Sequence, residues 1–202
     1  QVSVPKNPNI PAGNGIEFQT VSFTYEGAEK KALDTVTFTV PAGSTVALVG
    51  PSGGGKTTAA SLIPRFWDVD SGSVAVGGVD VREIGPKVLM EQVAFVFQNN
   101  RLFKTTILEN VRASRPEATR EEVLRALEAA QCSDIIEKMP NGVDTIIGTH
   151  GTFLSGGEQQ RIALARSILK DAPIVVLDEA TAFADPENEA LIQKAFAKLT
   201  QG

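Results

Sequence analysis

One glycine-rich segment has the residue types and the spacing of a phosphate-binding loop. Residues 50–57 are Gly-Pro-Ser-Gly-Gly-Gly-Lys-Thr and match the pattern G-x-x-x-x-G-K-[ST]. The glycines let backbone N–H groups turn toward phosphate oxygens, which a Cβ would obstruct. Lys56 can bridge the β- and γ-phosphates, and the Thr57 hydroxyl can ligate Mg²⁺. An ordinary Gly-rich turn is the alternative. The residues expected to bind a polyanion such as ATP are Ser52, Gly53, Gly54, Gly55, Lys56, Thr57 and Thr58.

Two carboxylates follow an apolar run further along the chain. Asp178 and Glu179 come directly after residues 174–177, Ile-Val-Val-Leu. In a parallel sheet such strand ends lie at the ligand site, where Asp178 can hold Mg²⁺. Glu179 is then a candidate general base for the water that attacks the γ-phosphate, although a solvated acidic turn is the simpler interpretation. Gln98 ends another apolar run and can ligate Mg²⁺ or hold the water.

A second glycine segment begins at Ser155, in residues 154–161, Leu-Ser-Gly-Gly-Glu-Gln-Gln-Arg. Ser155 and Glu158 have the spacing of a capping box, which predicts a helix N-terminus. That structural interpretation does not account for Gly156 and Gly157, which weaken a first helical turn. A hydroxyl, exposed N–H groups and the helix dipole together make an anion site. Since this site need not meet the chain's own phosphate loop, a head-to-tail dimer is the natural way to use both.

The intervening sequence predicts the elements that position these residues. Alternating segments at 16–25 and 33–40 predict an antiparallel sheet, and residues 73–81 predict a ribbon that turns at Gly77 and Gly78. The apolar runs 45–49 and 93–97 predict buried strands, with a helix from Lys56 to about Arg65. Residues 99–153 are expected to be mostly helical, with a capping box at Thr119. That helix has an apolar stripe of Val123, Leu124, Leu127 and Ala130.

The C-terminal part predicts a helix from Ser155 to about Lys170, the strand 174–177, and a last helix that Asp185 and Pro186 begin. Leu191, Ile192, Ala195, Phe196 and Leu199 share one face of that last helix.

Composition limits the classes of function. The 202 residues fit one domain with an inserted lobe, and the net charge of −5 argues against a nucleic-acid binder. The single cysteine, Cys132, excludes an internal disulfide framework and is compatible with a reducing compartment. There is no apolar run of about 18 residues, so we expect any membrane role to depend on a partner or on another segment.

Taken together, these motifs resemble those of an ABC-type ATPase domain over nearly the whole chain. The phosphate loop is 50–57, the signature motif is 154–158, and the Walker B strand with its catalytic Glu is 174–179. The resemblance implies an α/β fold of the P-loop NTPase class: a RecA-like core with a mainly parallel sheet, an antiparallel β lobe and an inserted helical lobe. It implies ATP and Mg²⁺ as ligands, and it makes Lys56, Gln98 and Glu179 the catalytic set.

The resemblance also assigns individual residues. Tyr25 is similar to the family's adenine-stacking aromatic, although a half-buried strand aromatic is the simpler interpretation. Gln98 is similar to the Q-loop residue, which in the family also senses the membrane partner, and Asp185 to the D-loop Asp. Ser155, Gly156 and Gly157 are expected to contact a nucleotide bound by a second such domain, identical or related, in a head-to-tail dimer.

The exporter-type subgroup is indicated by the first residues and by the segment 145–151. We expect residues 1–15 to be a linker from an upstream membrane domain. Residues 16–98 are the β lobe and phosphate-loop core, 99–154 a helical subdomain, and 155–202 the signature helix, Walker B strand and D-loop. This implies a place at the cytoplasmic face of a membrane, a bacterial inner membrane by resemblance, with no nucleic-acid partner. A soluble ABC ATPase acting on nucleic acid or ribosomes is the alternative.

Three departures from the family pattern stand out. The D-loop at 182–185 is Ala-Phe-Ala-Asp instead of Ser-Ala-Leu-Asp, and with residues 186–189 it resembles a branch of siderophore-related half-transporters. Thr149 and His150 replace the usual Glu-Arg before the signature. The family's switch His is absent, so we expect a chain truncated before that strand, with weak hydrolysis or nucleotide binding alone.

Overall fold

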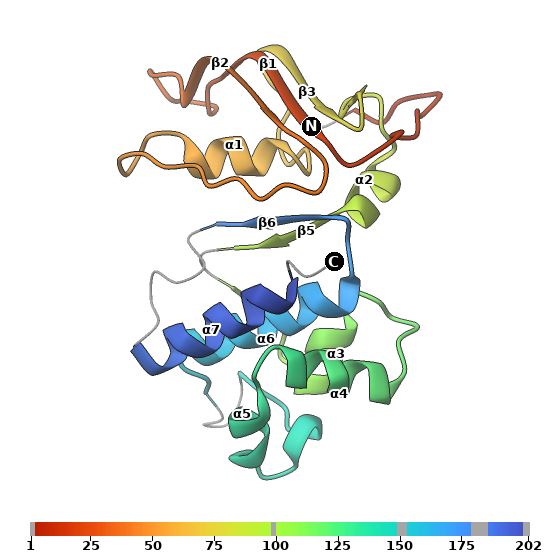
Figure 1. Cartoon of the computed structure of the whole chain (residues 1–202), viewed down its shortest axis with the longest axis vertical. Coiled ribbons are helices and arrows are strands. Elements are labelled where there is room, and N and C mark those ends of the chain that lie inside the picture. Colours follow the sequence, from red (N-terminus) through yellow and green to blue (C-terminus); the bar gives the residue numbers. More distant parts are fainter. Residues whose placement is uncertain (1–2, 98–99, 149–152, 179–185, 200–202) are drawn as a thin grey trace. The chain divides into compact units, whose positions relative to one another are not determined.

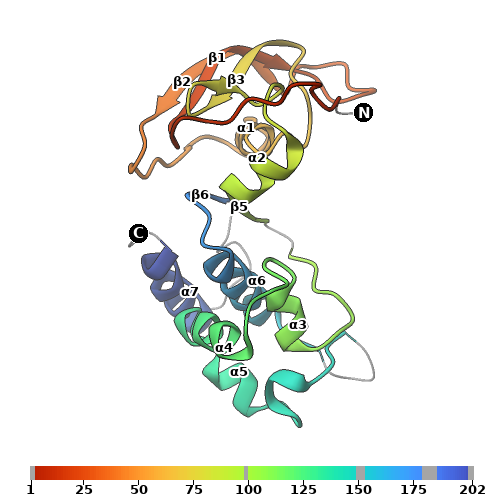
Figure 2. The same cartoon turned by 90° about the vertical axis from the view of Figure 1, so that its right-hand side faces the viewer.

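The computed structural model describes residues 3–97, 100–148, 153–178 and 186–199. These form two compact units, Gln1–Val93 and Ala94–Gly202 (Figures 1 and 2). In the described parts, no helix is both long enough and apolar enough to cross a membrane.

The first unit is built on a four-stranded sheet of order β2-β1-β3-β4 in which each neighbouring pair is antiparallel. In the first half of β1 burial alternates, with Ile16 and Phe18 buried and Glu17 and Gln19 more exposed, and a register shift between Phe18 and Val21 precedes the buried Val21. The ribbon turns at Gly77 and Gly78, as predicted. The strands are β1 Ile16–Phe23, β2 Leu33–Val40, β3 Ser71–Val76 and β4 Val79–Asp80, and the helices are α1 Lys56–Leu62 and α2 Pro86–Gln92. Helix α1 lies along one face of the sheet (Figure 1).

The predicted buried strand at 45–49 is wrong. That segment has no strand conformation, and Val46, Leu48 and Val49 are 49%, 42% and 92% exposed. An apolar run becomes a central strand only where a sheet supplies hydrogen-bonding partners, and period alone does not identify those partners. Helix α1 also ends earlier than predicted, at Leu62, and Arg65 adopts a left-handed conformation with φ 57°.

The N-terminal segment is attached to the first unit along the β3–β4 ribbon. Asn9 forms a parallel bridge with Ile84, and its N–H donates to the Glu83 carbonyl at 2.8 Å. Gly77 donates to the Gly15 carbonyl at 2.8 Å, and a Cβ at Gly77 would lie 2.3 Å from the Gly13 oxygen. The segment therefore follows the ribbon closely, although it forms no extended ladder within the described residues.

The second unit surrounds a long helix, α6, with shorter helices and a two-stranded sheet of β5 and β6. The helices between the two strands supply the long connection that a parallel pair requires. The elements are β5 Val93–Val96, α3 Ile107–Arg112, α4 Arg120–Ala129, α5 Ser133–Glu137, the 3₁₀ turn η1 Gly142–Asp144, α6 Gly156–Lys170, β6 Ile174–Leu177 and α7 Pro186–Leu199.

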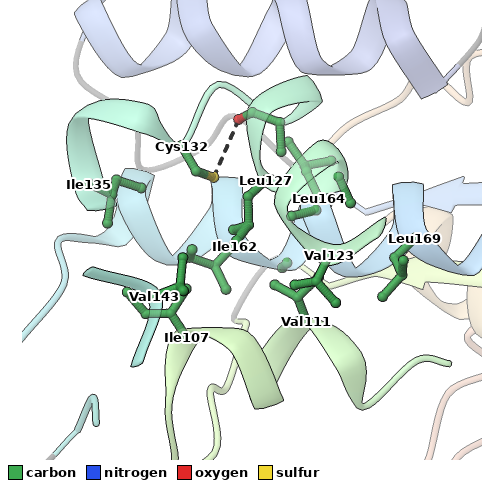
Figure 3. Packing of buried hydrophobic residues seen from close by; sticks show 14 of the residues in the cluster. Ile107, Val111, Val123, Leu127, Cys132, Ile135, Val143, Ile162, Leu164 and Leu169 are labelled. Atoms are coloured by element: carbon green, nitrogen blue, oxygen red, sulfur yellow. Dashed lines mark hydrogen bonds between the residues drawn. The ribbon is translucent and has the colours of Figure 1, made fainter. Parts of the chain in front are cut away.

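The core of this unit lies around α6, as Figure 3 shows. Ile162 and Leu164 are fully buried and pack among residues of α3 and α4. Thr119 forms the predicted capping box with Glu122, and the predicted stripe on α4 is buried except for Leu124, which is 39% exposed.

Cys132 lies in the same core. Its Sγ is 3.6 Å from the Ala130 carbonyl oxygen (Figure 3), and burial raises the pKa of this thiol to about 12.

An ion pair joins α6 to α5. The Arg161 side chain is 2% exposed, and its Nη1 and Nη2 donate to the Asp134 carboxylate at 2.6 and 2.9 Å. Arg161 also donates to the Gln131 carbonyl. These hydrogen bonds hold the pKa of Asp134 below its usual value, against the opposing effect of burial. A buried guanidinium needs these acceptors, because an unpaired charge in a core is strongly destabilising.

We predict that Asp134→Ala lowers the free energy of unfolding by about 1–2 kcal/mol, because it removes two charge-assisted hydrogen bonds from a buried cation and solvent screens part of the loss. Urea denaturation at pH 7 measures the change. The control is Asp144→Ala, which breaks the bidentate Arg120–Asp144 pair, whose side chains are 45% and 52% exposed. The control should lose less stability, and equal losses in both variants would contradict the prediction.

The Arg161–Asp134 pair makes the free energy of unfolding depend on pH. The folded-state pKa of Asp134 lies below its ordinary value of 3.8, so the contribution of the pair is complete above that value. It disappears as the pH falls through the lowered pKa. The stability difference between the wild type and Asp134→Ala should therefore be constant near neutral pH and shrink in acid.

Candidate nucleotide-binding site

The phosphate loop, residues 50–57, is a tight turn that leads into α1. Gly54 donates to the Pro51 carbonyl at 3.1 Å, and Gly53 and Gly55 have φ of +76° and +80°. A Cβ on Gly55 would lie 2.5 Å from the Ala32 carbonyl oxygen and 2.7 Å from Leu33 Cδ2. Gly55 is therefore required both by its backbone conformation and by the close approach of the chain before β2.

Lys56 is folded back over this loop. Its Nζ donates to the carbonyls of Gly50 and Pro51, at 2.9 and 2.8 Å. Thr57, the next residue, is exposed. The loop therefore places an ammonium group and an exposed residue with a hydroxyl group beside a run of glycine backbone, which is the chemistry that a chain of phosphates needs.

Tyr25 is joined to the helix that follows the phosphate loop. Its hydroxyl lies 3.1 Å from Oγ1 of the buried Thr58. The Tyr25 ring is nearly perpendicular to those of Phe23 and Trp67, with interplanar angles of 85° and 87°. Sequence reasoning selected both Tyr25 and Thr58 but did not foresee the bond between them. In this structure the Thr58 hydroxyl bonds to Tyr25.

In the second unit, Ser155 caps α6 as predicted. Its Oγ accepts from the Glu158 N–H at 3.2 Å, and the Glu158 carboxylate accepts from the Ser155 N–H at 2.8 Å. Gly156 is exposed in the first turn, whose N–H groups include donors without a partner inside the helix.

Packing explains why position 157 is a glycine, and the sequence alone did not reveal this. It is buried, and a Cβ at this position would lie 2.7 Å from Cγ of Asn188 on α7. Gly157 therefore has a packing role between α6 and α7 in addition to its predicted role in an anion site.

Asp178 lies directly after β6. It is 8% exposed, and its N–H donates to the Val96 carbonyl at 3.0 Å, which fixes its backbone to β5. Gln98, Glu179 and Asp185 lie outside the described residues, as does His150.

Asn100 is a further residue of interest that sequence reasoning missed. Its Nδ2 donates to the Phe97 carbonyl at 2.8 Å and to the side-chain oxygen of Gln160 on α6. The chain just after Gln98 is thus bonded to the first turns of the signature helix. The amide pair at 100 and 160 gave no signal in the sequence, since the two residues are far apart along the chain.

The residue types fit ATP with Mg²⁺. Mg²⁺ prefers oxygen ligands and is usually held by one or two carboxylates together with substrate phosphates. Asp178 supplies a carboxylate in the second unit, and Thr57 supplies a hydroxyl in the first. Among the residues that the structure describes, no group of three or more His, Cys, Asp or Glu side chains forms a metal cluster. The first unit contains the phosphate loop, Thr58 and Tyr25. The second unit contains the signature helix and Asp178.

A phosphate loop beside a sheet, with a carboxylate at a strand end and a capped glycine helix, defines a nucleotide-binding α/β domain of the P-loop NTPase class. The family described as ABC transporter matches residues 33–182, which is more than half of the chain. The chain belongs to the ABC transporter family.

Known relatives agree with this assignment. An ATP-dependent lipid A-core flippase from Vibrio vulnificus (strain YJ016) is 50% identical over 185 residues, covering 91% of this chain and 32% of the flippase. The flippase of the same name from Salmonella typhimurium is 49% identical over 189 residues, or 93% of this chain and 32% of its own length. The chain thus spans about a third of the length of these relatives.

A solved structure of a bacterial Atm1-family ABC exporter with ATP bound matches with a TM-score of 0.89. It is 37% identical and covers 98% of this chain and 35% of its own. The predicted fold class, a P-loop NTPase with an antiparallel sheet and a parallel sheet, is confirmed.

The two positive-φ glycines of the phosphate loop give a matched pair of variants. Gly55→Ala should destabilise the chain by about 3 kcal/mol, since it adds a steric overlap to the left-handed strain. Gly53→Ala should cost only about 1 kcal/mol, because its φ is similar but no atom lies within 4 Å of the added Cβ. Urea denaturation without nucleotide compares them, and equal losses would contradict the close approach at Ala32.

Proposed function

We propose that this chain is the ATP-hydrolysing domain of an ABC-type membrane transporter. One observation supports this most strongly: the Tyr25 hydroxyl bonds to Thr58, so the aromatic side chain suited to a base is joined to the helix that begins at the phosphate loop. A nucleotide needs those two features at a fixed separation. The family membership and the similarity to exporters agree with the proposal.

The loop residues bind the triphosphate. Backbone N–H groups of the loop and the Lys56 ammonium hold its oxygens, and Lys56 exchanges the Gly50 and Pro51 carbonyls for phosphate. The Tyr25 ring stacks on adenine. Thr57, Asp178 and Gln98 would supply the oxygen ligands for Mg²⁺, which would neutralise charge on the phosphates.

Hydrolysis then needs a positioned water. Glu179 accepts a proton as the water oxygen bonds to the γ-phosphorus, and the bond from that phosphorus to the oxygen bridging to the β-phosphate breaks. The products are ADP and inorganic phosphate. Most of the rate enhancement comes from positioning and from charge stabilisation by residues such as Lys56.

The partner is a second domain of the same kind. Ser155, Gly156 and Gly157 of one domain close on the γ-phosphate held by the other in a head-to-tail dimer, with Asp185 at the shared interface. A transmembrane domain on the same polypeptide couples this closure to transport, at the cytoplasmic face of the membrane. The relatives, about three times as long as this chain, support such an arrangement. We expect the dilute chain to bind ATP and to hydrolyse it slowly, because each pocket then lacks its partner.

Two substitutions separate binding from chemistry. Glu179→Gln should keep ATP affinity while reducing hydrolysis by roughly 100-fold or more, since general-base catalysis contributes at least that factor. Lys56→Ala should instead weaken ATP binding itself, by about tenfold or more. Calorimetry with ATP and Mg²⁺ measures affinity, and phosphate release from the full transporter measures turnover. Wild-type turnover in Glu179→Gln would refute the role of the base.

The structural and functional roles of Ser155 can be separated by a control on another capping box. Ser155→Ala and Thr119→Ala each remove an N-cap and should each cost about 1 kcal/mol of stability. Only Ser155→Ala should also lower ATP hydrolysis at saturating enzyme concentration. If phosphate release falls equally in both variants, Ser155 acts through stability alone.

A further inference from the structure

Three aromatic rings form one cluster in the first unit, beside the phosphate-loop helix. The Tyr25 and Phe23 ring centroids are 4.9 Å apart, those of Tyr25 and Trp67 5.7 Å, and those of Phe23 and Trp67 6.3 Å. Phe23 is 4% exposed and Trp67 is 48% exposed. Phe23 therefore forms the buried side of the cluster, and the Trp67 indole lies on its exposed side.

The loop that contains Trp67 is fixed on both sides of the indole. Before it, the buried Arg65 donates to both oxygens of Asp68, at 2.6 and 3.1 Å, and to the Arg82 carbonyl at 3.2 Å. After it, Asp70 donates to the Ser22 carbonyl on β1 at 3.0 Å. The exposure of Trp67 is thus a property of an anchored loop, in which a large apolar ring is held in solvent next to Tyr25.

The exposed part of this ring is apolar surface that a ligand can cover. An indole is among the largest apolar side chains, and burying it contributes more than burying most others. A purine has two fused rings, so a single phenol ring covers only part of its face. A second aromatic ring set nearly perpendicular to the phenol gives the base a further contact, which the larger purine can reach more fully than the smaller pyrimidine.

We propose that Trp67 is a second aromatic residue of the base site, positioning Tyr25 and favouring a purine. This inference rests on the proposed function, specifically on adenine binding at Tyr25. Phe23 supports the cluster from the core, and Trp67 sets the orientation of the Tyr25 ring and adds a second, nearly perpendicular contact for the base. The phosphate loop holds the triphosphate independently of the indole.

Calorimetry on the whole chain with three Mg²⁺ complexes tests this: ATP, CTP, and tripolyphosphate, which lacks a base. Trp67→Ala should weaken ATP binding about three- to tenfold, the range expected for one aromatic contact, and reduce the preference for ATP over CTP. Tripolyphosphate binding should not change. Trp67→Leu, which keeps apolar volume in the loop, should behave like Trp67→Ala, and Trp67→Phe should restore most of the affinity. Phe66→Ala is the control, because Phe66 is 40% exposed in the same loop.

The outcomes are distinguishable. Equal losses for ATP and tripolyphosphate would show that Trp67 only supports the loop, and would overturn the inference. If Tyr25→Ala weakens ATP binding while Trp67→Ala and Trp67→Leu do not, the inference fails but the proposed function stands. If the wild type binds neither ATP nor tripolyphosphate, both fail. Because Trp67 is the single tryptophan of the chain, its fluorescence should change with ATP and not with tripolyphosphate.

Discussion

The burial of α6 is the constraint on which the second unit depends. One helix supplies Ile162 and Leu164 to the core, and its Arg161 bonds to α5 from a position with almost no solvent contact. Its N-terminal turn is at the same time the candidate site for a partner's nucleotide. Because helix geometry is rigid over this length, packing along the rest of α6 fixes where Ser155 and its capping box lie. The position of the candidate site is thus set by the core of the helix, and the exposed first turn is left available for contact.

In the first unit, the position of the candidate site is fixed by different contacts. Its phosphate loop precedes a helix of only two turns, too short to be stable by itself. The loop is instead held by a close backbone approach at Gly55 and by the bond between Tyr25 and Thr58. These contacts link α1 to Tyr25, which follows β1, and to Ala32, which precedes β2. A small sheet therefore serves as the support for a loop that its own helix could not stabilise.

Local chemistry explains which features were predictable from the sequence. Capping boxes at Thr119 and Ser155 depend on neighbouring residues, and both were predicted correctly, as was the alternation over the first half of β1. The segment 45–49 was not, because whether an apolar run becomes a strand depends on partners elsewhere in the chain. The same holds for Gly157, whose packing neighbour Asn188 lies 31 positions away along the chain. For the candidate site, the sequence predicted the residue types, whereas the Tyr25–Thr58 bond and the indole beside it are tertiary contacts without a local pattern.

The charge of the chain adds a last constraint on how a triphosphate is held. A net charge of −5 does not attract an anion at long range, and salt screens charges beyond about 8 Å under physiological conditions. Arg65 and Arg82 are paired with Asp68 and Asp80. Burial acts to raise the pKa of Asp80, but hydrogen bonds and the charge of Arg82 together lower it below its usual value. Binding must then come from short contacts, namely glycine N–H groups and Lys56. Such contacts are directional, so the proposed site would recognise the shape of a phosphate chain and not merely its charge. The net negative charge of the chain also disfavours nonspecific binding to larger polyanions.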